Sequence, residues 1–330
     1  MFGQNWKLIL EPEITDPALN LALEEWAVRR LAPEHSYLFM YVNRPAVVLG
    51  HHQNILEEVN VRACWQQDVP ILRRISGGGT VVHDEGNLNI AFITEHTLRN
   101  FNQYRKFLQP IVRTLQSLGV PVEPDERNNL HIRGKKISGN AQFSSRGRLL
   151  SHGTLLFDSD LSRLKKLLQV PPNRLIKSRA TRSKPAPITN LRPYLGQNLI
   201  LKDLRSMLIK AFLGDSPRRV SFSNSEWSEI KTLAEEKYRD FDWNVGQSPE
   251  SEVVISIATP DDQTLSLKYS FEEGRFKNVF ISDQRLRFLQ SLMEGQPLKK
   301  ETFGRLQREI DELVDPLLKE KVQRIFNLWI

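Results

Sequence analysis

Three consecutive glycines follow two arginines in the segment Arg73–Thr80, R-R-I-S-G-G-G-T. Glycine has no side chain, so the backbone can approach a ligand closely here, and its N–H groups can point at phosphate or carboxylate oxygens. A structural turn would need only one or two glycines. The segment therefore predicts an anion-binding loop to which the arginines add positive charge. Its spacing is neither G-x-G-x-x-G nor G-x-x-x-x-G-K-[ST], so it supports neither a Rossmann dinucleotide site nor a P-loop.

The segment His83–Asn89, H-D-E-G-N-L-N, places polar side chains after this loop. On a strand, Asn87 and Asn89 would share one face, because successive side chains alternate between faces. They could line a polar pocket, although Asn87 also suits a residue that satisfies turn backbone. A metal site at His83 and Asp84 is not favoured, since neighbouring strand residues point to opposite faces.

A lysine stands among small residues in G-K-K-I-S-G-N-A, residues 134–141. On a strand, Lys136 and Ser138 would point the same way. A fixed ammonium there could stabilise the negative charge of a phosphoryl or acyl-phosphate group. Taken alone, the pattern favours an ordinary exposed lysine of a hairpin. His152, in S-H-G-T-L at 151–155, is by itself also more typical of a structural histidine.

The single cysteine, Cys64, excludes an intramolecular disulfide framework and any multi-cysteine metal site. It is predicted to lie on the buried face of a helix at 60–67, without a histidine or aspartate arranged beside it in the sequence. A catalytic thiol is therefore not expected. His51 and His52 are adjacent, which is poor spacing for chelating a metal.

Hydrophobic periodicity predicts the elements that position these motifs. Asp16 followed by Pro17 is typical of a helix start, and apolar residues at three- and four-residue spacing extend that helix over 17–31. A hairpin is predicted from 80–83 and 88–93, with Asp84-Glu85-Gly86 as its turn. The other expected elements of this part are strands at 37–43, 46–49, 69–72, 130–132, 136–138 and 154–157, and helices at 101–118, with a kink or a new start at Pro110, and from about Asp160.

Residues 170–195 carry prolines among serine, threonine, lysine and arginine, a composition that predicts a long loop. A loop of this length inside a compact domain is usually functional. Pro249 marks an expected boundary, because the pattern and the charge balance change near it. The elements expected in this half are helices at 200–213, 225–238, 284–293 and 300–327, and strands at 253–258, 264–270 and 275–282.

The length of 330 residues predicts two domains, and 40% hydrophobic residues are enough for a core. The net charge of +7 is uneven, because residues 246–330 carry 12 Lys/Arg and 14 Asp/Glu. From 127 to 184 there are 14 Lys/Arg against Asp158 and Asp160, a density that attracts an anionic partner. Few aromatic residues interrupt this stretch and no zinc-finger spacing occurs, so phosphate or an acidic protein is favoured over nucleic acid.

No stretch approaches the roughly 18–20 apolar residues that a membrane-spanning helix needs, so no membrane association is expected. The first residues lack the apolar core of a secretory signal and the Arg/Ser richness of a transit peptide. We therefore expect a cytoplasmic protein.

Together and in this order, the motifs resemble those of the lipoate–protein ligase A family. R-R-x-S-G-G-G-x-V-x-H-D-x-G-N-x-N is present at 73–89, K-I-S-G-[NS]-A at 136–141, H-G-T-L-L at 152–156 and T-N-L at 189–191. A run at 237–249 resembles the family's junction with its C-terminal accessory domain. The resemblance covers nearly the whole chain, and the first motif is long enough to be strongly specific.

The resemblance implies an α/β (α+β) fold, with a mixed-sheet catalytic domain like the biotin–protein ligase core at 1–245 and a smaller α+β accessory domain at 246–330. It implies an enzyme that uses ATP and Mg²⁺ to convert lipoate to lipoyl-adenylate and pyrophosphate. The lipoyl group would then pass to a lysine of a lipoyl-domain protein. The expected carriers are the acyltransferase subunits of 2-oxoacid dehydrogenases and the H protein of glycine cleavage.

The resemblance also assigns residues. Lys136 matches the family's essential lysine, whose ammonium would stabilise the charge that builds on the acyl-phosphate in both half-reactions. Arg73 and Gly77–Gly79 match the lipoate-binding loop, and Gly78–Val81 match positions that contact the nucleotide. No metal ligand is assigned. The expected binding residues are Arg73, Ser76, Gly77, Gly78, Gly79, Thr80, Val81, His83, Asn87, Ser138, Gly139, Ala141, His152, Gly153 and Thr154.

One segment departs from the bacterial pattern. Residues 178–191, S-R-A-T-R-S-K-P-A-P-I-T-N-L, look less like S-V-R-S-R-V-T-N-L than like the S-x-A-T-x-S-x-P form of mitochondrial lipoyltransferases. Those enzymes move a lipoyl or octanoyl group between carriers without activating free lipoate, which is the alternative function. A thiol-dependent octanoyltransferase is disfavoured because Cys64 lies outside the motifs. A basic nucleic-acid-binding module is the remaining, non-enzymatic alternative.

Overall fold

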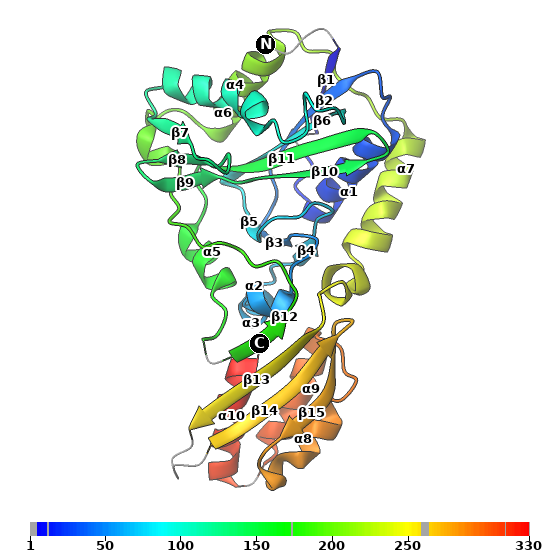
Figure 1. Cartoon of the computed structure of the whole chain (residues 1–330), viewed down its shortest axis with the longest axis vertical. Coiled ribbons are helices and arrows are strands. Elements are labelled where there is room, and N and C mark those ends of the chain that lie inside the picture. The colour runs from blue at the N-terminus through cyan, green and yellow to red at the C-terminus, as the bar shows by residue number, and fades with distance from the viewer. Residues whose placement is uncertain (1–4, 12, 173, 259–263, 314, 330) are drawn as a thin grey trace.

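The computed structural model describes residues 5–11, 13–172, 174–258, 264–313 and 315–329. Figure 1 shows an elongated molecule in which a larger upper part, containing the N-terminal two thirds of the chain, stands on a smaller part formed mainly by the C-terminal residues. Both parts combine helices with sheets, and both parallel and antiparallel pairs occur. This confirms the expected mixed-sheet α+β fold class.

A five-stranded mixed sheet forms the centre of the larger part. Its order is β1-β2-β6-β11-β10, with β1 parallel to β2 and the other neighbours antiparallel. Both faces are buried because the strands are apolar on both sides: in β2, Leu38 and Met40 face one cluster, and Tyr37 and Phe39 face another. The strands are β1 (Trp6–Ile9), β2 (Ser36–Tyr41), β6 (Asn87–Glu95), β10 (Asn140–Ser145) and β11 (Arg148–Leu156).

Helices cover both faces of this sheet. On one side lie α1 (Pro17–Arg30) and α7 (Asn224–Leu233), and on the other lie α4 (Tyr104–Ser117) and α6 (Leu201–Leu213). The prediction for α1 is confirmed to within one residue, and its start has the expected cause: the Asp16 carboxylate accepts hydrogen bonds from the backbone of Ala18 and Leu19. Pro110 lies inside α4, which continues as one helix.

Two three-stranded sheets flank the central one. The sheet β4-β3-β5 holds the glycine loop between β4 and β5, and the sheet β7-β8-β9 carries Lys136. Short helices pack beside them: α2, α3 and α5. The bounds are β3 (Ala46–Leu49), β4 (Ile71–Arg73), β5 (Val81–His83), β7 (Val122–Pro124), β8 (Leu130–Ile132), β9 (Lys135–Ser138), α2 (Ile55–Glu58), α3 (Val61–Gln66) and α5 (Leu161–Leu168).

The predicted hairpin of 80–83 and 88–93 is wrong. β5 pairs with β3, whereas β6 pairs with β2 and β11 in the central sheet. The reason is a close contact at Gly86, whose carbonyl accepts hydrogen bonds from the backbone N–H groups of Phe157 and Asp158. A Cβ on Gly86 would lie 2.1 Å from the carbonyl oxygen of Asp158, so this approach depends on glycine.

The smaller part contains a four-stranded antiparallel sheet, β12-β13-β14-β15, with helices packed on it. Its core also takes in α2, α3 and β3 of the larger part. The bounds are β12 (Arg174–Ser178), β13 (Ser251–Ala258), β14 (Thr264–Glu272), β15 (Arg275–Ile281), α8 (Arg287–Met293), α9 (Lys300–Asp311) and α10 (Pro316–Trp329). Because β12 precedes the expected boundary yet pairs with β13, the division at 245/246 stays a prediction.

Two further expectations need correction. The loop predicted for 170–195 contains strand β12, which the edge of the C-terminal sheet recruits by pairing. The single helix predicted for 300–327 is two helices, α9 and α10. Pro316 disfavours helical conformation at the residue before it, and Asp315 caps the second helix by accepting a hydrogen bond from the backbone of Leu318. Among the described residues, no helix is long and apolar enough to cross a bilayer.

Candidate functional site

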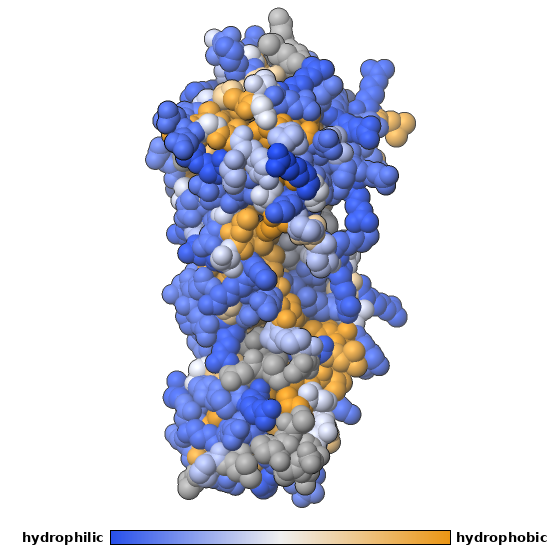
Figure 2. Space-filling view, turned by 90° about the vertical axis from the view of Figure 1, so that its left-hand side faces the viewer, coloured by the Kyte–Doolittle hydropathy of each residue, from blue (hydrophilic) through white to orange (hydrophobic). Residues whose placement is uncertain are grey.

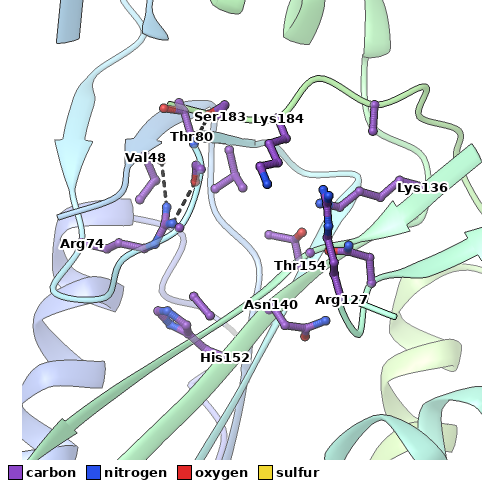
Figure 3. A pocket seen from close by; sticks show the side chains of 18 of the residues that line it. Val48, Arg74, Thr80, Arg127, Lys136, Asn140, His152, Thr154, Ser183 and Lys184 are labelled. Atoms are coloured by element: carbon purple, nitrogen blue, oxygen red, sulfur yellow. Dashed lines mark hydrogen bonds between the residues drawn. The ribbon is translucent and has the colours of Figure 1, made fainter. Parts of the chain in front are cut away.

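A cavity of about 540 Å³ lies where the glycine loop, strands β9, β10 and β11, and the segment 181–186 meet. Figure 3 shows Arg74 and Thr80 on one side of it, Lys136 and Arg127 on the other, and His152 and Thr154 on the sheet between them. Segments far apart in the sequence therefore form one site. The predicted residues that line this cavity are Gly78, Gly79, Thr80, Val81, His83, Lys136, Gly139, Ala141, His152, Gly153 and Thr154.

Four predicted residues lie outside the lining of this cavity and of its neighbour. Arg73, Ser76, Gly77 and Asn87 line neither cavity, whereas Ser138 lines the neighbouring one. Arg73 is fully buried, and its guanidinium donates hydrogen bonds to the carbonyls of Gly50, His51, Gln53 and Asn244. The structure thus gives Arg73 the position of a group that holds the segment 50–53.

The next residue, Arg74, is the arginine that faces the cavity. Its guanidinium donates to the Val48 carbonyl at 3.2 Å and to the carbonyls of Gly77 and Gly79 at 2.6 and 2.8 Å. These bonds fold the glycine loop around the guanidinium (Figure 3). Burial lowers the pKa of Arg74 to about 10, so the group stays positively charged at neutral pH.

Glycines at the cavity allow two segments of backbone to pack closely against each other. Gly78 has φ +90°, a region that favours glycine. A Cβ on Gly50 would lie 2.1 Å from the Gly78 carbonyl oxygen, so the two chain segments can cross only without that side chain. Similarly, a Cβ on Gly153 would lie 2.6 Å from the Gly139 carbonyl oxygen. These contacts bring the backbone of Gly78, Gly139 and Gly153 to the cavity wall.

A chain of polar side chains runs along the α1 side of the cavity. The Ser76 hydroxyl lies 2.6 Å from His152 Nε2, and His152 Nδ1 lies 2.8 Å from the Glu24 carboxylate. The Tyr41 hydroxyl donates a hydrogen bond to the Glu24 carboxylate at 3.0 Å. Burial raises the pKa of Tyr41 well above 10, so it remains a donor. The chain fixes the His152 ring at the cavity wall.

His83 lies beside this chain but has a different role. Burial lowers the pKa of His83 to about 3, and the nearby Arg74 guanidinium adds to that effect. The ring is therefore neutral at physiological pH. His83 Nδ1 lies 2.9 Å from Asn43 Nδ2 and accepts a hydrogen bond from that amide. His83 therefore lines the cavity as a neutral side chain.

Lys136 is held in place through its own backbone. Its N–H donates to the Pro187 carbonyl at 2.7 Å, and its carbonyl accepts from the Thr189 N–H at 3.0 Å. The side chain lies over Gly139, where a Cβ would be only 3.1 Å from Lys136 Nζ. Burial lowers the pKa of Lys136 below its ordinary value of 10.5, an effect that Asp125 opposes and Arg127 reinforces.

The electrostatics of the cavity favour an anion. Arg127, Lys136 and Lys184 line it, and none of them forms an ion pair with a carboxylate among the described residues. Asp125 lies on the same side of the cavity as Lys136, and its carboxylate accepts hydrogen bonds from the turn that follows it, 126–129. Burial alone would raise its pKa, but hydrogen bonds from Asn129 and the Arg127 backbone outweigh that effect and lower it. A polyanion would therefore meet several cations here.

A second, more apolar cavity of about 820 Å³ adjoins the first. Lys136, Thr80 and Lys184 are among the residues that line both. Figure 2 shows apolar side chains gathered midway along the face that carries α5, one of several apolar areas on that face. The apolar residues of the lining are Val81, Val82, Leu156, Leu161, Leu164, Leu168, Pro185, Ala186, Pro187 and Ile188.

Cysteine and metal chemistry find no support in the described residues. Cys64 is buried, lines neither cavity, and burial raises the pKa of its thiol to about 12. That agrees with the expectation that it is not a catalytic thiol. Across the described ranges, no group of three or more His, Cys, Asp or Glu side chains could hold a metal ion on its own.

Reasoning from the sequence missed part of this cavity. Arg74 and Asn140 stood inside the motifs, so their local signal was present but did not separate them from their neighbours. The others come from helices, strands, turns and the loop that the fold brings to the motifs. Asn89, which the sequence suggested could line a polar pocket, does line the cavity. The lining residues that were not predicted are Leu21, Glu24, Tyr41, Val48, Arg74, Asp125, Arg127, Asn129, His131, Asn140, Thr181, Arg182, Ser183, Lys184, Pro185 and Ala186.

Comparison with known proteins gives a consistent result. The sequence profile of the lipoyl protein ligase A/B catalytic domain matches residues 16–213. The lipoate–protein ligase 1 of Staphylococcus aureus is 39% identical over 277 residues, which are 83% of this chain and 79% of that protein.

Two solved structures have the same fold. A bipartite lipoate protein ligase from Thermoplasma acidophilum, described with its E2 lipoyl domain, has a TM-score of 0.64 at 24% identity and covers 74% of this chain and 98% of its own. A lipoate-protein ligase A bound with ATP has a TM-score of 0.62 at 23% identity, covering 74% and 100%.

Proposed function

The chain is an enzyme of the lipoyl protein ligase A/B family, and from this premise we propose that it activates lipoate with ATP and transfers the lipoyl group to a lysine of a lipoyl-domain protein. The observation that carries the proposal is the shared cavity, in which the glycine loop and Arg74 face Lys136 and Arg127. Backbone N–H groups and several cations are what a carboxylate and a triphosphate require when they must lie side by side.

The first half-reaction joins two anions. A carboxylate oxygen of lipoate attacks the α-phosphorus of ATP, and an O–P bond forms. The bond from that phosphorus to the oxygen bridging the β-phosphorus breaks, and its electron pair leaves on pyrophosphate. Positive groups fixed around the α-phosphate lower the repulsion between the anions and stabilise the charge of the transition state. We assign this task to Lys136, whose backbone N–H and carbonyl are both hydrogen-bonded, as the catalytic residue.

The second half-reaction uses the same ammonium. The uncharged ε-amine of the target lysine attacks the acyl carbon, and a C–N bond forms. The C–O bond to the phosphate breaks with its electron pair leaving on AMP, and the nitrogen gives up one proton to water. Lys136 stabilises the phosphate oxygen on which the charge collects. The carriers that we propose are acyltransferase subunits of 2-oxoacid dehydrogenases and the glycine cleavage H protein.

Mg²⁺ fits this site only as an ion that arrives with the nucleotide. The described residues offer no complete set of metal ligands, and Glu24 is already bonded to Tyr41 and His152. Magnesium commonly takes one or two carboxylates and completes its shell with substrate phosphates and water. Asp125 lines the cavity on the Lys136 side, but its carboxylate already accepts hydrogen bonds from Asn129 and the Arg127 backbone, so we assign it no metal. An ion that arrives with ATP would neutralise phosphate charge.

The assignment of individual residues is part of the proposal. Within the expected set, we give direct contact with substrate to those that line the cavities, and a supporting role to Arg73, Ser76, Gly77 and Asn87. The division into a catalytic part at 1–245 and an accessory part at 246–330 is likewise proposed, as is a cytoplasmic location.

Pyrophosphate exchange tests the function directly. With lipoate, ATP, Mg²⁺ and radiolabelled pyrophosphate, we expect label to enter ATP, because a reversibly formed adenylate returns to ATP when pyrophosphate attacks it. Without lipoate, the exchange should fall to background. Absence of exchange, combined with transfer of lipoyl groups from a loaded carrier, would instead establish the lipoyltransferase alternative that residues 178–191 suggested from the sequence.

The pH dependence of exchange should report on Lys136. Its pKa lies below 10.5, so the ammonium loses its proton, and the rate falls, as the pH rises through that lowered value. Following exchange rather than transfer avoids the titration of the target lysine. In Lys136→Arg the alkaline fall should move to higher pH, because a guanidinium keeps its proton there. An unchanged alkaline limb in that variant would contradict the assignment.

A further inference from the structure

The segment 181–188 crosses the cavity mouth and is fastened at one end through Ser183. The Ser183 N–H donates to Glu58 at 2.8 Å, and its hydroxyl bonds to the other oxygen of the same carboxylate. That hydroxyl also accepts from the Thr80 N–H at 2.9 Å and from Gln53 at 3.1 Å. The segment is thereby joined to the end of the glycine loop and to helix α2.

The other end is fastened to strand β9. The Pro187 carbonyl and the Thr189 N–H both bond to the backbone of Lys136. Between the two attachments lie Lys184, Pro185 and Ala186, and proline restricts the backbone of this short span. Lys184 is therefore held between the glycine loop and the catalytic lysine.

The side chain of Lys184 points into the space between Thr80 and Lys136 (Figure 3), and the residue lines both cavities. No carboxylate in the described part of the chain lies within ion-pair distance of its ammonium. Arg182, two residues earlier, contrasts with it, because Glu57 binds that guanidinium, with Nε 2.9 Å from the carboxylate. The charge of Lys184 is thus available to a ligand.

We propose that Lys184 binds the β- and γ-phosphates of ATP and stabilises pyrophosphate as it leaves, an inference that rests on the proposed function. Lys136 is partly buried beside Gly139, whereas Lys184 is exposed at the mouth. The leaving group must depart through the mouth. Negative charge builds on the oxygen that bridged the α- and β-phosphorus when its bond breaks, and an ammonium there stabilises it. Once pyrophosphate has left, Lys184 has no further task.

The proposal separates the two half-reactions. In Lys184→Ala, we expect pyrophosphate exchange to fall about tenfold or more, the usual effect of losing a hydrogen bond to a charged group. Transfer from supplied lipoyl-adenylate should stay within about twofold of the unaltered enzyme, and Lys184→Arg should recover part of the exchange. Lys166→Ala is the matched control, since it removes an exposed lysine of α5 that lines neither cavity. Exchange at the normal rate, or an equal loss in both half-reactions, would overturn the proposal.

A binding measurement separates this inference from the proposed function. Equilibrium dialysis with Mg·ATP, AMP and pyrophosphate should show weaker binding of ATP and pyrophosphate in Lys184→Ala, and unchanged binding of AMP. If the unaltered enzyme shows no exchange, the ligase function fails, yet this comparison still decides whether Lys184 holds the outer phosphates. Equal affinities in the two proteins for all three ligands would overturn the role of Lys184.

Discussion

Lys136→Ala is expected to slow transfer from supplied lipoyl-adenylate about a hundredfold, because an ammonium fixed in a site that excludes water contributes on the order of 3 kcal/mol to the transition state. Pyrophosphate exchange should fall at least as far, since the same charge acts in both half-reactions. The loss concerns rate rather than folding, because the backbone bonds to Pro187 and Thr189 do not involve the side chain. Single-turnover transfer to an isolated lipoyl domain measures the effect.

Lys135→Ala provides the control for this experiment. Lys135 is the adjacent residue on β9, is exposed and lines neither cavity. It should transfer at the normal rate, and both variants should unfold at the temperature of the unaltered protein. Near-normal transfer in Lys136→Ala would show that the resemblance had assigned the wrong lysine.

Gly50→Ala is the second substitution with a large expected effect. The new Cβ would lie 2.1 Å from the Gly78 carbonyl oxygen and 3.2 Å from Nη2 of Arg74, so the glycine loop has to move. We expect exchange to fall about a hundredfold, as displacements of around 1 Å in a catalytic site commonly cause. Overpacking of this kind also lowers the free energy of unfolding by about 1–3 kcal/mol.

Exchange rates and denaturant unfolding, measured on the same preparation, separate the two consequences of Gly50→Ala. Gly196→Ala is the control, since its Cβ would have no heavy atom within 4 Å. A normal rate of exchange in Gly50→Ala would contradict this expectation, because the loop would then tolerate displacement from the Gly78 contact.

The two predictions show how unevenly sequence and structure contributed to the site. Lys136 belongs to a motif of contiguous residues, so the role that we propose for it could be assigned from the chain alone. Gly50 belongs to no such motif, and its importance arises from a contact with Gly78, which is 28 residues later in the sequence. The resemblance assigned Arg73 to the lipoate-binding loop, whereas in the structure Arg74 lines the cavity, because only the direction of each side chain decides which one meets it.

Local rules were sufficient where the cause of a structure is local. The Asp16 cap and the spacing of apolar residues determined the start and length of α1, since both act within a few residues. Alternating residues likewise predicted β13, β14 and β15, whose bounds lie close to the expected strands. The long glycine motif was sufficient to identify the family, because a motif of this length with every specified position present is strongly specific.

Tertiary structure decided what depends on contacts between distant segments. The packing of Gly86 against Asp158 sends β5 and β6 into different sheets, and the edge of β13 turns part of an expected loop into β12. The same physics placed Lys184 opposite Lys136, through the bonds of Ser183 and Pro187. Local patterns in the chain predicted most helices and strands, identified the family and led to the proposal of Lys136 as the catalytic lysine. The pairing of strands and the set of cations around the cavity follow from long-range contacts, whose energies no local pattern of residues encodes.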